Sequence, residues 1–135
     1  MGIYRNILVP LAYDPGHPAK AEIAAARALA APGAQITLLH VLDPVPHFAA
    51  AHMPESARDA ARTTVEHDLE RHAGALLGAE VRVTEGDPGR EIVAQATELG
   101  CDCIVMASHR THKGEYGSTT ARVVRKAHCA VHLLR

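Results

Sequence analysis

Residues 6–11, Asn-Ile-Leu-Val-Pro-Leu, form an apolar run as long as a β-strand, with no polar residue after Asn6. A strand with one face in water alternates apolar and polar residues, whereas a strand covered on both faces is apolar throughout. Residues 6–11 are therefore predicted to be an inner strand of a parallel sheet whose two faces are both covered by helices.

Four more segments with strand character follow, and helix-like segments separate them. The predicted strands after the first are residues 35–42, 81–84, 103–107 and 130–134. The predicted helices are residues 18–31, 55–77, 88–99 and a last helix that begins at Ser118. Strands that alternate with helices indicate an α/β fold, here an open five-stranded parallel sheet with right-handed crossovers and helices on both faces.

Sequence signals define the ends and the buried faces of these helices. Asp87-Pro88 is typical of a helix start, because an aspartate accepts a free backbone amide and a proline fits the first helical position. Gly100 is predicted to end that helix, and Pro32-Gly33 to end the first one. The long helix has an apolar stripe at every fourth position, made of Ala57, Ala61, Val65, Leu69, Ala73 and Leu77. In the last helix, the residues predicted to face the core are Val123, Val124 and Ala127.

Composition predicts one domain in a reducing compartment. The chain has 135 residues, of which 47% are hydrophobic, which suffices for a single domain over residues 1–135. The net charge is -1, so nothing attracts the chain to nucleic acid or to an anionic membrane surface. No apolar stretch approaches the about 20 residues of a membrane span, and no signal-peptide layout opens the sequence. With three cysteines, an odd number, we expect free thiols and a cytoplasmic protein.

The predicted ligand site lies beyond the carboxyl ends of the strands. In open parallel sheets, ligands bind there at the point where the strand order reverses. The predicted lining is therefore the segment after each of the first four strands, residues 10–14, 41–43, 86–87 and 107–118. The segment after the fourth strand, residues 107–118, is the most informative, because Gly117-Ser118 leads into a helix whose free amides suit a phosphate. Glycine followed by serine is also a common way to cap a helix, and this alternative remains open. No other phosphate-binding fingerprint is present.

Other reactive side chains do not form a recognisable site. His109 and His112, with Cys101 and Cys103 nearby, do not match the spacing of zinc ligands, so no metal is predicted. Cys101 is interpreted as a small apolar filler, with a redox role as the alternative. Arg122, Arg125 and Lys126 are predicted to complement the C-terminal dipole of the last helix. No catalytic triad or carboxylate pair is recognisable, and no residue is predicted to be catalytic.

Five motifs, taken in order, resemble the universal stress protein family over nearly the whole chain. They are Ile7-Leu8-Val9-Pro10, Leu38-Leu39-His40-Val41, Glu85-Gly86-Asp87-Pro88-Gly89-Arg90-Glu91-Ile92, Asp102-Cys103-Ile104-Val105-Met106-Ala107-Ser108-His109, and Gly117-Ser118 followed by Arg122-Val123-Val124. The resemblance implies a sheet with strand order 3-2-1-4-5, which reverses between the first and fourth strands. It also implies a cytosolic regulatory protein of the stress response that is not an enzyme.

The resemblance implies an adenine-nucleotide site for ATP or AMP. Its contacts, carried over position by position, fall on Pro10, Leu11, Val41, Met106, Ala107, Arg110, Gly117, Ser118 and Thr119. In ATP-binding members of the family, the fourth strand is followed by G-x2-G-x9-G-[ST]. Here Ala107 and Arg110 replace the first two glycines, and the loop to Gly117 is three residues shorter.

These departures leave two alternatives open. The first is a nucleotide-free homodimeric interaction module, like the family members that do not bind ATP. The second is a slow nucleotide hydrolase, which the lack of a candidate base and of a Walker-type lysine disfavours. A homodimer is expected in either case, because residues 130–134 form a last strand without proline. The resemblance implies that this strand pairs with its counterpart in a second copy.

We expect Arg110→Gly to weaken ATP binding about tenfold or more, although it restores the residue of the family. The shortened loop offers fewer backbone amides, so the cations Arg110 and Lys113 become the main source of affinity. A charge-assisted hydrogen bond contributes about 1.5–3 kcal/mol. Titration calorimetry of both proteins with ATP measures the difference. Tighter binding by the glycine variant would mean that Arg110 obstructs the site.

Overall fold

Five parallel strands form a single sheet in the computed structural model, which describes residues 2–11, 19–42, 55–74, 78–108 and 117–135. The sheet order is β3-β2-β1-β4-β5, so the predicted order is confirmed. The strands are β1 (Tyr4–Pro10), β2 (Ala30–Leu42), β3 (Glu80–Glu85), β4 (Cys103–Ala107) and β5 (Ala130–Leu134).

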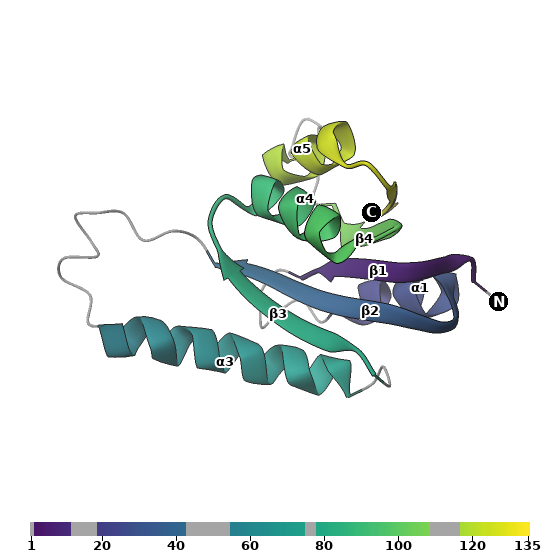
Figure 1. The fold of residues 1–135 in the computed structure, drawn as a ribbon. Coiled ribbons are helices and arrows are strands. Elements are labelled where there is room, and N and C mark those ends of the chain that lie inside the picture. The colour runs from purple at the N-terminus through teal and green to yellow at the C-terminus, as the bar shows by residue number, and fades with distance from the viewer. Residues whose placement is uncertain (1, 12–18, 43–54, 75–77, 109–116) are drawn as a thin grey trace.

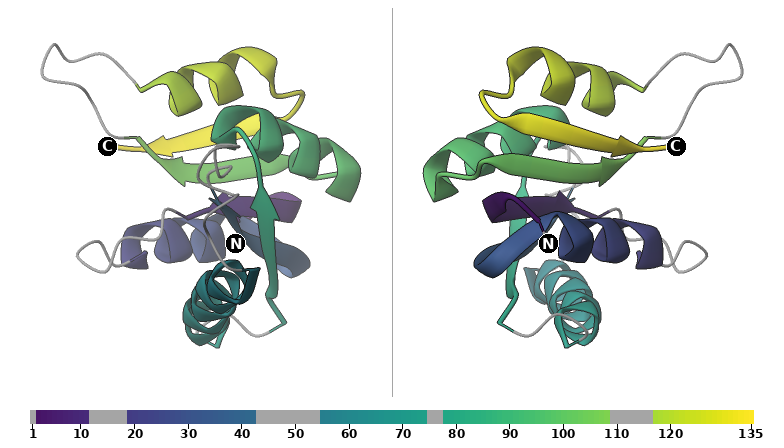
Figure 2. Two further views of the ribbon diagram at one scale, coloured as in Figure 1. Left: turned by 90° about the vertical axis from the view of Figure 1, so that its left-hand side faces the viewer. Right: turned by 90° about the vertical axis from the view of Figure 1, so that its right-hand side faces the viewer.

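Helices cover both faces of the sheet, as predicted (Figures 1 and 2). The helices on one face are α1 (Lys20–Leu29) and α3 (Glu55–Ala73), and those on the other are α4 (Pro88–Leu99) and α5 (Ser118–Lys126). Successive side chains of a strand point to opposite faces. Ile7 and Val9 therefore pack with α1 and α3, whereas Leu8 packs with α4 and α5. All three are fully buried, which is the physical reason for the unbroken apolar run.

The junction between α1 and β2 differs from the prediction. The helix ends at Leu29 and the strand begins at once, whereas a helix to residue 31 and a strand from residue 35 were expected. Ala30 has the extended angles φ -76° and ψ 130°, and it pairs with Tyr4 of β1. Ile3 also donates its backbone amide to the Leu29 carbonyl, at 3.1 Å. Pro32-Gly33 therefore lies within β2 and does not end α1. Pairing with β1 begins the strand earlier than the helix and strand propensities of these residues predict.

Only part of the predicted apolar stripe of α3 is buried. Val65 and Leu69 pack against the sheet, but Ala57 and Ala61 are exposed. Arginines hold the first half of the helix instead: Arg58 Nη2 lies 3.2 Å from Glu85 Oε1, and Arg62 Nη1 donates to the Val83 carbonyl at 3.2 Å. The predicted end of this helix at Leu77 lies outside the described residues.

The signals at the ends of α4 are confirmed, whereas one inward residue of α5 is not. Asp87 Oδ2 accepts the backbone amide of Arg90 at 3.1 Å, and Gly100 takes a left-handed conformation with φ 68°. In α5, Val123 is fully buried but Val124 is 53% exposed. Adjacent helical residues point about 100° apart, so both valines cannot face the same core.

Asp102 ties the amino edge of the sheet together. Its two carboxylate oxygens accept the backbone amides of Arg5 and Asn6, at 2.9 and 3.0 Å, and its own amide donates to the Asn6 carbonyl at 2.9 Å. Desolvation opposes ionisation of Asp102, but backbone hydrogen bonds led by those from Arg5 and Asn6 outweigh it. The pKa of this carboxyl is therefore lowered from its ordinary value of 3.8.

The cysteines near this edge are free thiols among the described residues. Burial, with the nearby Cys129 thiol and Asp102 carboxylate, raises the pKa of Cys101 to about 11. Burial also raises the pKa of Cys103 to about 11. The reactive species is the thiolate, so a thiol that stays protonated at neutral pH behaves as an apolar filler.

We expect Asp102→Asn to destabilise the protein by about 1 kcal/mol at neutral pH, since at this exposed position it loses one of the two charge-assisted hydrogen bonds and removes the charge from the other. The pKa of Asp102 in the folded protein lies below the value of 3.8 in the unfolded chain. The stability that the ionised Asp102 contributes is therefore present above the unfolded pKa and is lost as the pH falls through the folded pKa. The difference between parent and variant should therefore be constant above about pH 5 and shrink in acid.

Urea unfolding between neutral pH and acid measures this difference. Glu98→Gln is the matched control, because it removes an exposed carboxylate elsewhere on the surface, 3.8 Å from Arg82. A difference between parent and Asp102→Asn that persists unchanged below the pKa would contradict the assignment.

Candidate functional site

Hydrogen bonds fix the positions at which the strands leave the carboxyl edge of the sheet. Leu11 donates its backbone amide to the Leu39 carbonyl at 2.7 Å, and its own carbonyl accepts Nδ1–H of His40 at 2.7 Å. Ser108 donates to the Leu134 carbonyl at 2.8 Å, and Gly86 to the Leu42 carbonyl at 3.0 Å. The exits of neighbouring strands are thus tied to one another, and the segments that follow start from defined points.

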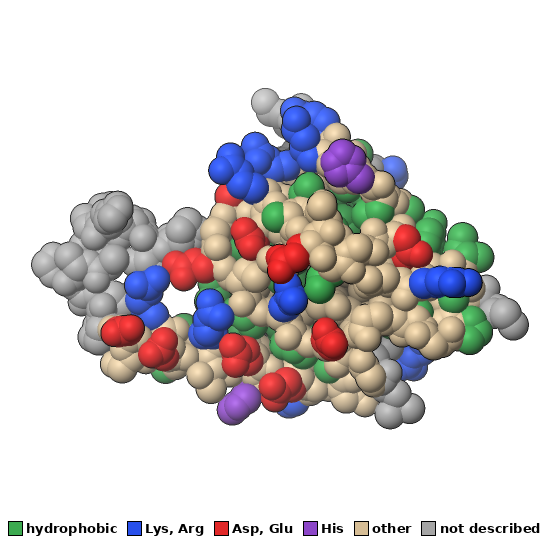
Figure 3. Space-filling model, in the orientation of Figure 1, with side chains coloured by type: hydrophobic (Ala, Val, Ile, Leu, Met, Phe, Trp, Pro, Cys, Tyr) green, Lys and Arg blue, Asp and Glu red, His purple; other side chains and the backbone are tan. Residues whose placement is uncertain are grey.

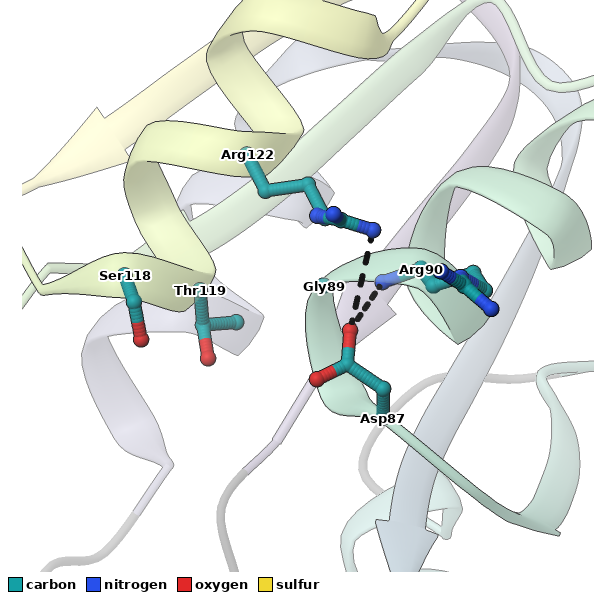
Figure 4. A pocket seen from close by; sticks show the side chains of 6 residues that line it. All are labelled: Asp87, Gly89, Arg90, Ser118, Thr119 and Arg122. Atoms are coloured by element: carbon teal, nitrogen blue, oxygen red, sulfur yellow. Dashed lines mark hydrogen bonds and ion pairs between the residues drawn. The ribbon is translucent and has the colours of Figure 1, made fainter.

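Helices α4 and α5 begin at this edge on the same face of the sheet, and a hollow of about 380 Å³ lies between their first turns. Ligand pockets typically measure about 300–1,000 Å³. The residues that line this one are Asp87, Gly89, Arg90, Ser118, Thr119 and Arg122 (Figure 4). The strand order reverses between β1 and β4 at the same edge.

The start of α5 forms one wall of the hollow. Gly117 precedes the helix in an extended conformation, with φ -64° and ψ 162°, and no side chain among the described residues caps the helix there. Its first turn carries no acidic residue, so its free amides and positive dipole end are not neutralised locally. Ser118 and Thr119 extend their hydroxyl groups from this turn, across the hollow from Asp87 (Figure 4). Hydroxyls and free amides together suit an anion.

Asp87 and the guanidinium of Arg122 occupy the opposite wall. The Arg122 side chain lies across the start of α4, and a Cβ on Gly89 would come within 2.9 Å of Arg122 Cδ. Glycine at position 89 therefore allows the two helices to approach. Arg122 Nη1 is 3.9 Å from Asp87 Oδ2, and the side chains are 43% and 62% exposed. Such a pair contributes less than about 1 kcal/mol.

Basic side chains gather over this end of the molecule. Figure 3 shows lysines and arginines over α5, whereas acidic and basic side chains are interspersed over α3. Besides Arg122, the exposed Arg125 and Lys126 belong to α5 and lie in its last turn. Among the described residues that line the hollow, Asp87 is the single carboxylate, against Arg90 and Arg122, so this part of the site has net positive character.

The predicted site residues separate into two groups. Ser118 and Thr119 line the hollow, directly after Gly117. Along the edge, Pro10 ends β1, Ala107 ends β4 and Val41 is the last but one residue of β2, but none of them lines the hollow. Leu11 and Met106 are nearly fully buried, and Met106 packs in the core beneath α4 and α5. Arg110 lies outside the described residues, so its role stays a prediction.

Sequence reasoning found part of the α4 side of the hollow. Gly86-Asp87 was among the predicted lining segments, but Gly89 and Arg90 were given no role there, and Arg122 was assigned to the C-terminal dipole of α5. In the structure, Arg122 lies before the last turn and points back toward the start of α4 (Figure 4). The sequence did signal that α4 and α5 both follow strands that end at one edge, which places both helix starts at that edge but does not bring their first turns together.

Among the described residues, no three His, Cys, Asp or Glu side chains are grouped as a metal ion requires. The described lining therefore offers one carboxylate, two hydroxyls, the guanidinium of Arg122 and free amides, whereas the side chain of Arg90 points away from Ser118 and Thr119 (Figure 4). None of the described helices is long and apolar enough to cross a membrane.

Comparison with known proteins gives a consistent match. The family model described as "Universal stress protein family" matches residues 3–135. The universal stress protein UspA from Lactobacillus plantarum is 26% identical, with a TM-score of 0.79 and coverage of 98% of both chains. The hypothetical protein MJ0577, the subject of a structure-based assignment of biochemical function, is 24% identical, with a TM-score of 0.80 and coverage of 97% of this chain and 95% of that one.

Some similar structures contain nucleotides. A universal stress protein in complex with cAMP is 21% identical, with a TM-score of 0.70 and coverage of 98% of this chain and 97% of that one. Two others, with TM-scores of 0.64, are the Archaeoglobus fulgidus protein in complex with dAMP and an Arabidopsis thaliana family protein with AMP bound. At such low identities, these likenesses establish a shared fold.

Proposed function

Since the chain belongs to the universal stress protein family, we propose that it is a regulatory protein that binds an adenine nucleotide at the carboxyl edge of its sheet. The observation that carries this proposal is the hollow between the first turns of α4 and α5, where hydroxyls, free amides and an arginine face one space. Similar structures with cAMP, dAMP and AMP support an adenine nucleotide as the ligand.

In this proposal, the phosphates lie against the first turn of α5. The amides after Gly117 and the hydroxyls of Ser118 and Thr119 donate to phosphate oxygens, and the helix dipole favours the negative charge. The nucleoside extends toward the ends of β1 and β2, near Pro10 and Val41. Binding replaces water at these amides and adds charge-assisted hydrogen bonds, which are stronger than neutral ones.

The proposed role is non-catalytic and cytoplasmic. Among the described residues, Asp87 is the one carboxylate that lines the hollow, and its Oδ2 accepts the Arg90 amide as the cap of α4, so we assign it a structural role. We propose that the nucleotide acts as a signal in the stress response, and that its occupancy changes what the surface around α5 presents to a partner.

We expect Ser118→Glu to reduce ATP affinity about tenfold or more, because the new carboxylate occupies the place of the phosphate and repels it. The same change should leave the thermal midpoint unchanged or slightly raised, because a glutamate in the first turn of a helix contributes about 0.3–1 kcal/mol. Titration calorimetry with ATP and thermal unfolding measure the two effects separately.

Ser118→Gln is the matched control, since it has the same size without the charge, and we expect it to retain most of the affinity. Equal ATP affinities of the parent and of Ser118→Glu would contradict the proposed position of the phosphates at the first turn of α5. Absence of ATP, ADP and AMP binding to the parent protein would contradict the proposed function itself.

A second candidate function, that of a dimeric interaction module, is favoured by the free edge of β5. Ala130 donates its amide to the Asp102 carbonyl at 3.3 Å, and the Leu134 carbonyl accepts from Ser108. Backbone groups alternate along a strand, so those of Val131 and Leu133 point away from β4. An edge of this kind is a template for pairing with a second copy. We propose a homodimer through this strand, with or without a bound nucleotide.

We expect the parent to be a dimer at tens of micromolar and Val131→Pro to be monomeric. Proline removes an outward amide but no hydrogen bond to β4, and prolines are tolerated in edge strands. Multi-angle light scattering measures the mass, and His132→Pro, whose amide faces β4, is the control that loses stability instead. A monomeric parent would contradict this proposal and leave nucleotide binding untouched.

A further inference from the structure

The Arg122–Asp87 contact is a feature of the hollow that nucleotide binding at the start of α5 does not require. Asp87 Oδ2 accepts the Arg90 amide at 3.1 Å and lies 3.9 Å from Arg122 Nη1 (Figure 4). The first distance is that of a hydrogen bond, whereas the second exceeds the range of one. Asp87 is thus firmly held by α4, and Arg122 is attracted to it without being hydrogen-bonded to it.

Arg122 keeps its capacity to bind another anion in this arrangement. Its guanidinium carries five N–H donors in a fixed fork that suits phosphate oxygens. Among the described residues, the 3.9 Å approach to Asp87 is its one ion pair. The stem of the side chain is supported along Gly89, so the charged end is aimed at the space between the two helices.

Asp87 opposes the binding of anions in the same space. Its carboxylate lines the hollow and faces Ser118 and Thr119 (Figure 4). An incoming phosphate is attracted by Arg122 and by the start of α5, but it is repelled by Asp87. Asp87 cannot simply move away, because it caps α4. A ligand must therefore gain more from Arg122 and from the start of α5 than it loses by repulsion from Asp87 and by drawing Arg122 away from that carboxylate.

From this geometry we propose that the hollow is a site for a phosphate chain, in which Arg122 binds the distal phosphates and Asp87 sets the charge that a ligand needs. This inference rests on the proposed function and specifies its ligand class, the nucleoside triphosphates in preference to monophosphates. Attraction to Arg122 grows with the charge of the ligand, so AMP gains less from it than ATP does, while both meet the same small cost of drawing Arg122 from Asp87.

The test compares three ligands that share parts of one molecule: ATP, AMP and inorganic tripolyphosphate. Titration calorimetry is carried out on the full chain at one fixed ionic strength, because salt screens exposed charges. The variants are Arg122→Gln, Asp87→Asn and Arg125→Gln. Arg125→Gln is the matched control, since it removes the same charge from the same helix but does not line the hollow. Asparagine caps helices as well as aspartate does, so Asp87→Asn preserves the start of α4.

We expect the parent to bind ATP about tenfold or more tightly than AMP, and Arg122→Gln to abolish most of this preference. Asp87→Asn should raise the affinity for tripolyphosphate about threefold to tenfold, since it removes a repulsive charge at short range. Arg125→Gln should leave the preference for ATP unchanged.

Each remaining outcome decides between the two proposals. Equal affinities of the parent for ATP and AMP would overturn the phosphate-chain site while the nucleotide function stands. Equal losses in Arg122→Gln and Arg125→Gln, or weaker tripolyphosphate binding by Asp87→Asn, would also overturn it. Binding of tripolyphosphate without any nucleotide would support the site and contradict the nucleotide function, and no binding of any ligand would contradict both.

Discussion

The packing of β1 between two layers of helices is the interaction on which the rest of the structure depends. Ile7, Leu8 and Val9 are fully buried, and they alternate between the core under α1 and α3 and the core under α4 and α5. Each such side chain contributes about 1.5–3 kcal/mol by leaving water. A strand buried in this way must be central and parallel to its neighbours, which directs every strand exit to one edge and every helix start to the same edge.

That constraint also creates the candidate site. Because α4 and α5 cover one face and both follow strands that end at the carboxyl edge, their first turns lie side by side. Two positive helix ends at close range repel each other unless an anion lies between them. Asp87 supplies part of that charge by capping α4, while the start of α5 lacks an acidic residue. The remaining positive character is what the proposed ligand neutralises.

The departures of this chain from the ATP-binding loop of its family acquire a physical interpretation in this setting. A loop with glycines binds phosphate by its backbone amides, whereas a shorter loop must rely more on charge. Arg122 supplies a positive charge from α5 itself, and because it belongs to the helix, its position does not depend on the length of the loop. Gly89 makes this possible, because any larger residue would push the arginine away from the start of α4.

The sequence by itself determined the α/β class, the strand order through the family resemblance, and the caps at Asp87 and Gly100, because burial and capping are written in local patterns. It placed the start of β2 at residue 35, whereas the strand begins at Ala30, and it pointed Val124 toward the core, whereas that side chain is exposed. Strand pairing and the choice between adjacent helical positions depend on partners that are distant in the sequence. The hollow itself was decided only by tertiary structure. Arg122 is far along the chain from Asp87 and Gly89, and their meeting depends on how closely α4 and α5 pack on the sheet, a distance that no local pattern encodes.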